Sequence, residues 1–259
     1  MKGEPLHRFV RVAASMERLN RLLVVLLLGA AALAAGSAHD HRAWQHGINL
    51  LPIDGRYLLI WSSWGNPPRP RLRGDWEHDI YYSWLDAAQP RLDIQTLVSR
   101  PEAQEPASAA VNRHGTLLVT WEDGDGRINQ NAQLWDSALH PLSARPLRVR
   151  DGGHSGHVAA SGEHFLIAYG EDWVAGGAFL DRGTGKHLHA RIVGPDGNLG
   201  PEIDVAIRRD PDQRENWPRV AASGHNWLIV WQRYPQRSLQ GALIERDGRV
   251  TRRCASRSI

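Results

Sequence analysis

The chain has 259 residues, 42% of them hydrophobic, which allows one large all-β domain or two smaller domains with a full apolar core. Its formal net charge of +3 lies entirely in residues 1–38, which carry five basic and two acidic side chains. The other residues are neutral in total and contain no basic run with interleaved aromatics, so the composition speaks against nucleic acid as a partner.

Residues 1–38 have the pattern of a signal peptide. The apolar block LLVVLLLGAAALAA at 22–35 follows Arg18 and Arg21 and precedes three small residues. The block has 14 residues, fewer than the roughly 20 that a membrane-spanning helix needs, so a retained anchor is the less favoured interpretation. The sequence therefore predicts a cleaved leader, a periplasmic or secreted domain over 39–259, and no stable membrane insertion after cleavage.

Cleavage after Ala38 would create a terminus that begins His39-Asp40-His41. Its amine, two deprotonated backbone amides and the imidazole of His41 form the square-planar nitrogen set that Cu(II) prefers, so His39 and His41 are candidate metal ligands. The competing interpretation is a floppy terminus that happens to contain two histidines. Apart from Cu(II) we expect no cofactor, and the single cysteine, Cys254, excludes an intrachain disulfide.

A sequence unit recurs four times after the leader. Each copy has a small-residue strand, a tight turn such as Asp54-Gly55, and an apolar run that ends in an aromatic residue. Continuous apolar runs such as LLIW predict strands covered on both faces, with the closing aromatics packed between neighbouring sheets. These closing aromatics, at intervals of 60, 48 and 62 residues, are Trp61, Trp121, Tyr169 and Trp231.

In each copy a third strand ends at an aspartate, and a fourth, more polar strand brings the next copy round. The aspartates are Asp86, Asp136, Asp196 and Asp247. Four strands per repeat at a period of about 50 to 60 residues are typical of a propeller blade. The sequence therefore predicts an all-β fold, a β-propeller of about four four-stranded blades over approximately 44–100, 101–150, 151–208 and 209–259.

Residues 79–123, DIYYSWLDAAQPRLDIQTLVSRPEAQEPASAAVNRHGTLLVTWED, resemble the passage from blade to blade in sialidase-type propellers, which are built from BNR repeats. In that family an IYYS-like strand leads through a turn to an LVS strand and then to a GxLxVxW strand. The aspartate turns here lack the Ser-x-Asp-x-Gly-x-Thr-Trp box, so the repeats are degenerate and the resemblance holds at superfamily level. It implies a β-propeller fold and places a sialidase-like glycosidase among the candidate functions.

Sialidases generally have six blades, whereas this sequence shows four. Two arrangements remain open. Either four blades close into a small ring, with the segment near Trp44 completing the last sheet, or the chain is part of a larger ring whose open sheet edge favours aggregation or dimerisation.

The long connections of the repeats indicate where a ligand binds. The second and third strands are joined by long segments at 62–78 and 170–186, which share one end of the propeller with the links at 151–157 and 208–217. Long loops on a rigid scaffold tend to carry binding residues. The candidates on this rim are Trp64, Asp75, Trp76, Glu77, His78, Glu122, Asp123, Glu171, Asp172, Trp173, Arg214, Glu215 and Trp217. Exposed indoles beside charged groups suit sugars; alternatively, the indoles fold back and plug the ring.

The sequence thus predicts an exported, non-catalytic binding module for a glycan or a protein. A glycosidase is the alternative, with carboxylates such as Glu171 and Asp172 and, by the sialidase resemblance, Tyr234 as nucleophile. The resemblance would also require an early Arg-Ile-Pro-like motif and an arginine triad, and neither is matched, which favours binding over catalysis. The second alternative is periplasmic copper binding at the mature N-terminus. Two histidine pairs are further candidates for zinc or copper: His154 with His157, and His187 with His189.

Overall fold

The computed structural model of the chain describes residues 46–65, 78–86, 92–123, 128–171, 187–207, 210 and 212–255. All of them belong to the compact unit His41–Ile259, which is distinct from the unit Met1–Asp40. The expected leader and the copper ligands His39 and His41 lie outside the described residues, as do five rim candidates: Asp75, Trp76, Glu77, Asp172 and Trp173. Within the described ranges no helix could traverse a bilayer.

The described residues form four antiparallel sheets, each built from four consecutive strands, which we call blades 1 to 4. Blade 1 contains β1 (His46–Ile53), β2 (Arg56–Trp64), β3 (His78–Leu85) and β4 (Gln95–Val98). Blade 2 contains β5 (Glu105–Val111), β6 (Leu117–Asp123), β7 (Asn129–Trp135) and β8 (Leu147–Asp151). Blade 3 contains β9 (His154–Ser161), β10 (His164–Gly170), β11 (Leu188–Val193) and β12 (Ile203–Ala206). Blade 4 contains β13 (Arg214–Ser223), β14 (Asn226–Tyr234), β15 (Ser238–Ile244) and β16 (Val250–Ala255). This confirms the predicted all-β fold with four four-stranded blades.

The tight turns of the repeats fix which residues face the neighbouring blade. Asp54 and Gly55 have φ angles of 49° and 77°, both in the left-handed region that a two-residue type I′ turn requires. The turn pairs Ile53 with Arg56. Because side chains alternate along a strand, this register sends Leu58 toward blade 2 and Tyr57 to the opposite face.

Three apolar clusters hold the propeller together, and each joins consecutive blades: 1 with 2, 2 with 3, and 3 with 4. The closing aromatics are all buried, each at most 2% exposed: Trp61, Trp121, Tyr169 and Trp231. The last three belong to clusters between blades, as predicted. Trp61 instead lies against Tyr81 of its own blade, with 6.2 Å between ring centroids.

A side chain of each inner strand also clasps the backbone of the next inner strand. Asn49 Oδ1 accepts a hydrogen bond from the Ala109 N–H (2.9 Å), Ser108 Oγ from the Val158 N–H (3.1 Å), and His157 Nδ1 from the Val220 N–H (3.1 Å). The three acceptors occupy the same register position in β1, β5 and β9. In β13 this position is occupied by Arg219. An inner strand has no neighbouring strand on one side, so the clasp satisfies an N–H that the sheet leaves unpaired.

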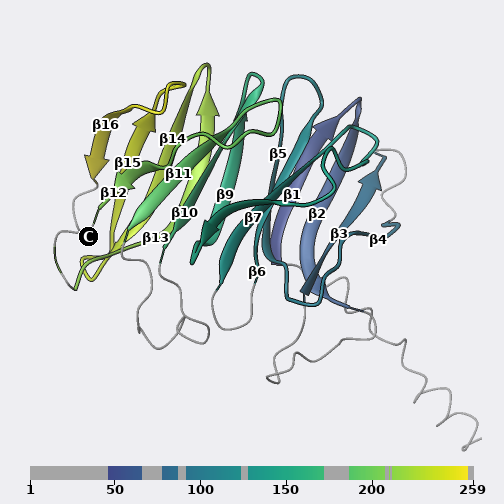
Figure 1. The fold of residues 1–259 in the computed structure, drawn as a ribbon, viewed down its shortest axis with the longest axis horizontal. Helices are drawn as coiled ribbons and strands as arrows, with labels where there is room; N and C mark the ends of the chain where they lie inside the picture. The colour runs from purple at the N-terminus through teal and green to yellow at the C-terminus, as the bar shows by residue number, and fades with distance from the viewer. Residues whose placement is uncertain are drawn as a thin grey trace, which may run out of the picture. The chain divides into compact units, whose positions relative to one another are not determined.

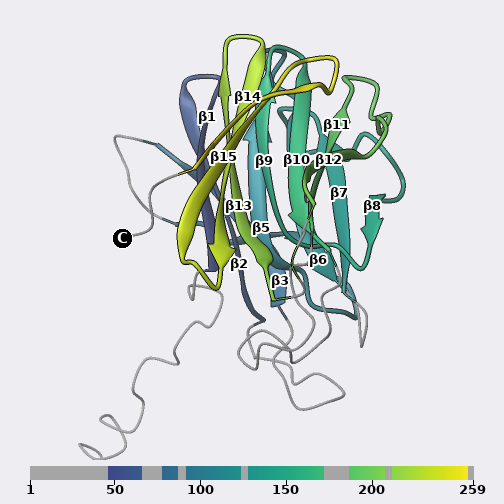
Figure 2. The ribbon, with the colours of Figure 1, turned by 90° about the vertical axis from the view of Figure 1, so that its left-hand side faces the viewer.

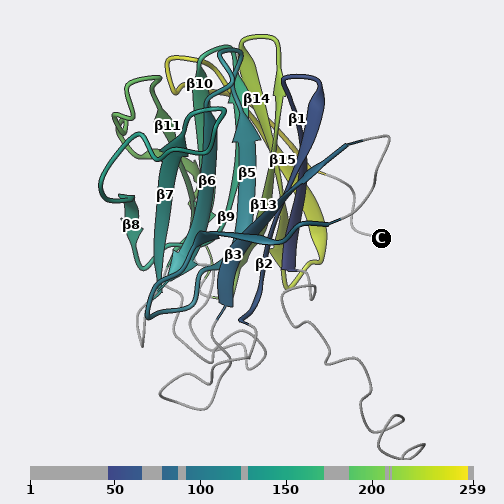
Figure 3. The same ribbon diagram turned by 90° about the vertical axis from the view of Figure 1, so that its right-hand side faces the viewer.

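The four blades of the described residues are packed in series. The inner strands β1, β5, β9 and β13 contact one another in that order. Figure 1 shows blade 1 at one side and blade 4 at the other, and Figures 2 and 3 look onto the two ends of this series. Among the described residues no apolar cluster joins blade 4 to blade 1. β1 pairs with β2 of its own blade. Trp44, which the first of the two closure schemes involves, lies outside the described residues.

Candidate functional site

The strand ends that carry the long connections lie at one end of the blades, which we call the rim. Strand pairing places His46 beside Ser62, His154 beside Gly170, and Arg214 beside Tyr234, so the inner strands begin where the second strands end. The described rim candidates therefore share one end of the fold. They are Trp64, His78, Glu122, Asp123, Glu171, Arg214, Glu215 and Trp217.

Glu171 is the centre of a network of charged groups at the junction of blades 2 and 3. Its Oε2 lies 2.9 Å from Arg150 Nη2 and 3.0 Å from His189 Nε2, and its Oε1 lies 3.4 Å from His187 Nε2. The carboxylate is only 8% exposed, so these three partners replace most of the water that it gives up on burial. Glu171 and His187 also bracket the connection at 172–186, and the Glu171 N–H donates to the His187 carbonyl.

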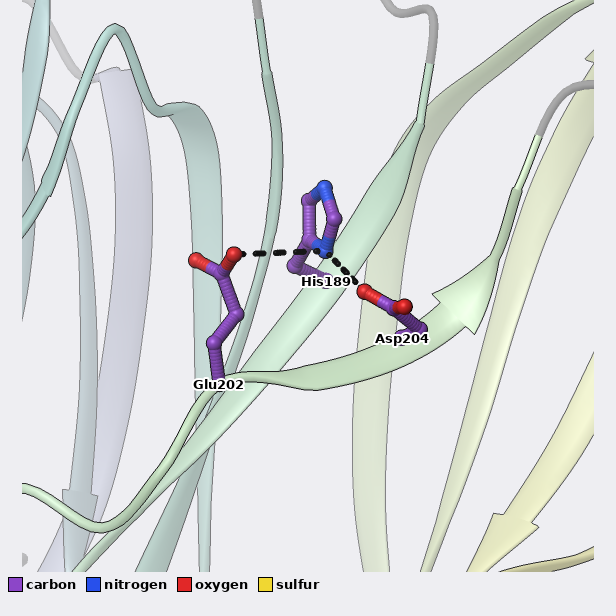
Figure 4. A group of neighbouring side chains, drawn as sticks. All are labelled: His189, Glu202 and Asp204. Atoms are coloured by element: carbon purple, nitrogen blue, oxygen red, sulfur yellow. Dashed lines mark hydrogen bonds and ion pairs between the residues drawn. The ribbon is translucent and has the colours of Figure 1, made fainter.

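The second ring nitrogen of His189, Nδ1, lies near two more carboxylates. His189 Nδ1 lies 3.0 Å from Asp204 Oδ1 and 3.7 Å from Glu202 Oε1, as Figure 4 shows. Both ring nitrogens thus face carboxylate oxygens, which accept hydrogen bonds and cannot donate them when ionised. Carboxylates therefore hold the His189 ring at both of its nitrogens.

The donor atoms of His189, Glu202 and Asp204 lie within 4.8 Å of one another, a spacing at which they could hold a metal ion. Arg150, however, pairs through Nη1 with Glu202 as well as with Glu171. A guanidinium therefore already supplies positive charge to Glu202, one of the two carboxylates of this group, and the group is best described as part of an ion-pair network between β8, β11 and β12.

The electrostatics of Glu202 follow from its partners. Burial alone would raise its pKa, but hydrogen bonds from the Tyr169 hydroxyl (2.8 Å) and from Arg150 outweigh burial and hold the pKa below its ordinary value. Burial and the bond to Glu202 in turn raise the pKa of Tyr169. The network thus keeps a carboxylate ionised and a phenol neutral.

A second group at the rim joins Glu122 to the start of β9. Glu122 Oε2 accepts from the Ser155 N–H at 2.9 Å, and His154 Nδ1 lies 2.9 Å from Ser155 Oγ. Ser155 has a φ of 52°, in the left-handed region. A serine beside a histidine is the arrangement of an activated nucleophile. The side chains are nevertheless enclosed, since Ser155 is 4% and His154 1% exposed, and burial lowers the His154 pKa to about 3.

The third group lies where β13 begins. Trp217 is 43% exposed and has a φ of 57°, at an irregularity in the pairing of β13 with β14. Two residues earlier, Glu215 is fully buried and accepts hydrogen bonds from Trp231 Nε1 and from Arg233 Nε, the latter at 2.7 Å. The buried Glu215 thus anchors the strand on which the exposed indole stands.

A cavity of about 480 Å³ adjoins this third group. Its volume falls in the range of roughly 300–1,000 Å³ that is common for ligand pockets. Polar and charged side chains line it beside apolar ones; the polar and charged ones are Asp204, Gln213, Arg233, Gln240 and Arg253.

The other described rim candidates make local contacts. Trp64 is half-buried and lies 6.0 Å from the ring of His78, whose Nδ1 lies 3.2 Å from Glu105 Oε2. Asp123 Oδ1 lies 3.5 Å from Arg148 Nη1. The structure therefore gathers the rim candidates into separate small groups on different blades, and of the described rim indoles it exposes Trp217 more than Trp64.

Sequence reasoning missed Arg150, Ser155, Glu202 and Asp204. Arg150, Glu202 and Asp204 lie on or beside the fourth strands, LRVRD and IDVA, which the sequence marked only as polar. The alternation of charged and apolar residues in these strands was the available signal, because it sends one charged row toward the neighbouring blade. The partners of each charge are far away in the sequence, so no local motif indicates them.

No protein-family model and no curated protein matches the sequence. Solved structures do match the fold. One is an α-L-arabinofuranosidase from Lactobacillus brevis, with a TM-score of 0.52, 13% identity, and coverage of 78% of this chain and 74% of that one. Another is a thermostable family-43 glycoside hydrolase, with a TM-score of 0.50, 13% identity, and coverage of 79% and 73%.

A third match is a subtype N10 neuraminidase-like protein of the strain A/little yellow-shouldered bat/Guatemala, with a TM-score of 0.53 and 5% identity. The alignment covers 80% of this chain but only 58% of the neuraminidase-like protein. At these identities the likeness concerns the fold. The chain therefore has a sialidase-type β-propeller fold, with four blades in the part of it that the structure describes.

Proposed function

We propose that this chain is a non-catalytic glycan-binding propeller, and that its ligand lies on the rim over Trp217. One observation carries the proposal: a large indole is held exposed in a backbone conformation that bulky residues avoid, with a φ of 57° and an exposed fraction of 43%. Such a conformation costs on the order of 1–3 kcal/mol and is found where ligands are clamped.

The groups near the start of β13, the strand that carries Trp217, suit a sugar. An indole face packs on the C–H surface of a pyranose ring, and charged or amide groups nearby hydrogen-bond its hydroxyls. Gln213 and Arg233 line the cavity beside the start of β13, while Glu215 fixes Arg233 from below. The names of the structural matches, an arabinofuranosidase and a family-43 glycoside hydrolase among them, support a glycan as the ligand class.

Two carboxylates of the charged network, Glu171 and Glu202, support binding over hydrolysis. A glycosidase needs a carboxylic acid whose pKa is raised so that it can protonate the leaving group. The pKa of Glu202 is instead held below its ordinary value despite its burial, because of Tyr169 and Arg150. Glu171 is occupied by Arg150, His187 and His189.

The test is retention on a panel of immobilised polysaccharides. We expect the wild type to be retained by at least one of them and Trp217→Ala to lose that retention while its thermal unfolding changes by no more than a few degrees. Tyr57→Ala is the matched control, because Tyr57 is 45% exposed but lies beside the turn at the other end of blade 1. If Trp217→Ala were retained as strongly as the wild type, the proposal would be wrong. Release of the leaving group from aryl glycosides by the wild type would replace it with the glycosidase alternative.

A further inference from the structure

The two terminal blades each leave one apolar face uncovered. Leu58, Leu118, Leu166 and Leu228 occupy the same position in the second strands of the four blades. The first three are 0% exposed because the following blade covers them, whereas Leu228 is 40% exposed. The face of blade 4 that carries Leu228 thus has the residues of a blade-to-blade interface without a blade against it.

Other apolar residues share that face of blade 4. Strand pairing places Ala221 and Leu243 beside Leu228, and Val230 and Leu239 follow on the same side of the sheet. Ala221 is exposed, and Leu239 is 52% exposed. We call these five residues the open face of blade 4.

Blade 1 has the complementary half of the same interface. Tyr57 stands where the other blades have Leu117, Phe165 and Trp227, which are 0% exposed at the contact with the preceding blade. Tyr57 itself is 45% exposed. Ile48 and Leu50, on the same side of β1, are 59% and 55% exposed. We call Ile48, Leu50 and Tyr57 the open face of blade 1.

We propose that the open face of blade 4 docks head to tail on the open face of blade 1 in a second copy of this chain. The occupant follows from the repeat: three junctions within the chain already join a blade-4-like face to a blade-1-like face, so each end presents a surface that the other end is built to cover. Terminal units of repeat proteins normally bear a polar outer face, whereas these two expose large hydrophobic residues: Leu50 and Tyr57 on blade 1, and Leu228 and Leu239 on blade 4. A contact between two different faces is heterologous, and it closes into a ring or continues from copy to copy.

The inner strands supply a polar detail of this contact. At the junction of blades 1 and 2, Asn49 Nδ2 donates to the Ala107 carbonyl at 3.1 Å. Arg219 occupies the Asn49 position in blade 4, and Ile48 occupies the Ala107 position in blade 1. Arginine has donors and no acceptor, so in the proposed contact Arg219 of one copy donates to the Ile48 carbonyl of the other.

The experiment measures the mass of the full chain in solution, by sedimentation equilibrium, for the wild type and for two charge variants. We expect the wild type to associate, and Leu50→Glu and Leu228→Glu each to weaken association at least about tenfold, because each buries an unpaired carboxylate in the contact. Leu142→Glu is the matched control, since Leu142 is 55% exposed in the turn between β7 and β8 and lies on neither open face.

Mixing the two charge variants identifies the head-to-tail geometry. The Leu50→Glu protein keeps an intact blade 4 face and the Leu228→Glu protein keeps an intact blade 1 face, so an equimolar mixture regains one good contact per pair. Association restored only in the mixture supports the proposal. A contact between two blade 4 faces would instead leave Leu50→Glu fully associated, and that result overturns it.

Two further results would overturn the proposal. One is a wild type that stays monomeric at about 100 μM, where a contact with a Kd of 1 μM would be saturated. The other is association that survives both substitutions, as it would if the apolar block at 22–35 caused it. Far-UV circular dichroism shows whether each variant is folded. If Leu228→Glu does not fold, Ala221→Glu replaces it, because Ala221 is exposed on the same face of blade 4.

Discussion

The backbone N–H of Val220 donates to Nδ1 of His157 over 3.1 Å, across the junction between blades 3 and 4. A histidine nitrogen can accept this bond only while it carries no proton. Burial, and next the charge of Arg219, lower the pKa of His157 to about 4, which keeps the ring neutral at physiological pH. The junction is therefore coupled to pH through one side chain.

This coupling predicts a loss of stability in mild acid. The unfolded chain takes up a proton at His157 near pH 6.5, whereas the folded chain resists protonation until about pH 4. The free energy of unfolding should therefore fall between these two pH values, by on the order of 3 kcal/mol from this residue. His157→Asn keeps an acceptor, as Asn49 does at the same position of β1, and should flatten that fall when urea unfolding is measured from pH 7 to pH 4. His225→Asn, at an exposed position, should not. Equal pH profiles for the wild type and His157→Asn would contradict the assignment.

Leu166 and Leu228 offer a comparison of the same side chain with and without a covering blade. Leu166→Ala should destabilise the chain by about 2–5 kcal/mol, because it leaves a cavity between blades 3 and 4. Leu228→Ala should cost less than about 1 kcal/mol, because this leucine keeps 40% of its surface exposed. Chemical denaturation at low protein concentration measures both values for the separate chain. Similar losses for the two variants would mean that Leu228 is covered after all.

The sequence alone was sufficient to predict the repeat, the number of blades and the burial of the closing aromatics. These features depend on short stretches of sequence. Turns such as Asp54-Gly55 and apolar runs such as LLIW recur at intervals of similar length, and each of them predicts the strands next to it. The exposure of Leu228 could not be predicted in this way, because its local sequence resembles that of Leu166. The two leucines differ in whether another described blade packs against them, and the residues around each leucine do not show this.

The candidate site was less predictable for a similar physical reason. The sequence drew attention to Glu171 and to the His187/His189 pair, and the structure brings these three together. Their other partners are Arg150 in the fourth strand of blade 2 and Glu202, which immediately precedes the fourth strand of blade 3. Pairing between blades depends on how the sheets stack, which spacing along the chain does not show.

The Tyr169 hydroxyl supplies the next test. It is buried and donates to Glu202 Oε2 at 2.8 Å, so Tyr169→Phe should destabilise the chain by about 1–3 kcal/mol at neutral pH. Because the pKa of Glu202 lies below its ordinary value, its contribution is present above that ordinary value and is lost as the pH falls through the lowered pKa. The difference between the wild type and Tyr169→Phe should therefore shrink at low pH. Thermal unfolding measured at a series of pH values from 7 down into the acid range follows it, with Tyr57→Phe as the exposed control. A difference that stays constant would assign the effect to packing and not to Glu202.

The substitution Glu171→Gln is the strongest test of the charged network, because it removes the charge and keeps the shape of the side chain. Glu171→Gln leaves Arg150 and His189 facing a neutral amide at a site where the carboxylate is only 8% exposed. Removing one partner of a buried ion pair typically costs about 3–5 kcal/mol. The loss here should fall toward the lower end of that range, because Arg150 keeps its pair with Glu202 and His189 keeps Asp204. Asp123→Asn is the matched control: its partner Arg148 is half-exposed and 3.5 Å away, and such a pair contributes at most about 1 kcal/mol. Urea denaturation at neutral pH compares the two variants. If Glu171→Gln were as stable as Asp123→Asn, the network would not hold blades 2 and 3 together, and Glu171 would have to be considered for a role in ligand chemistry instead.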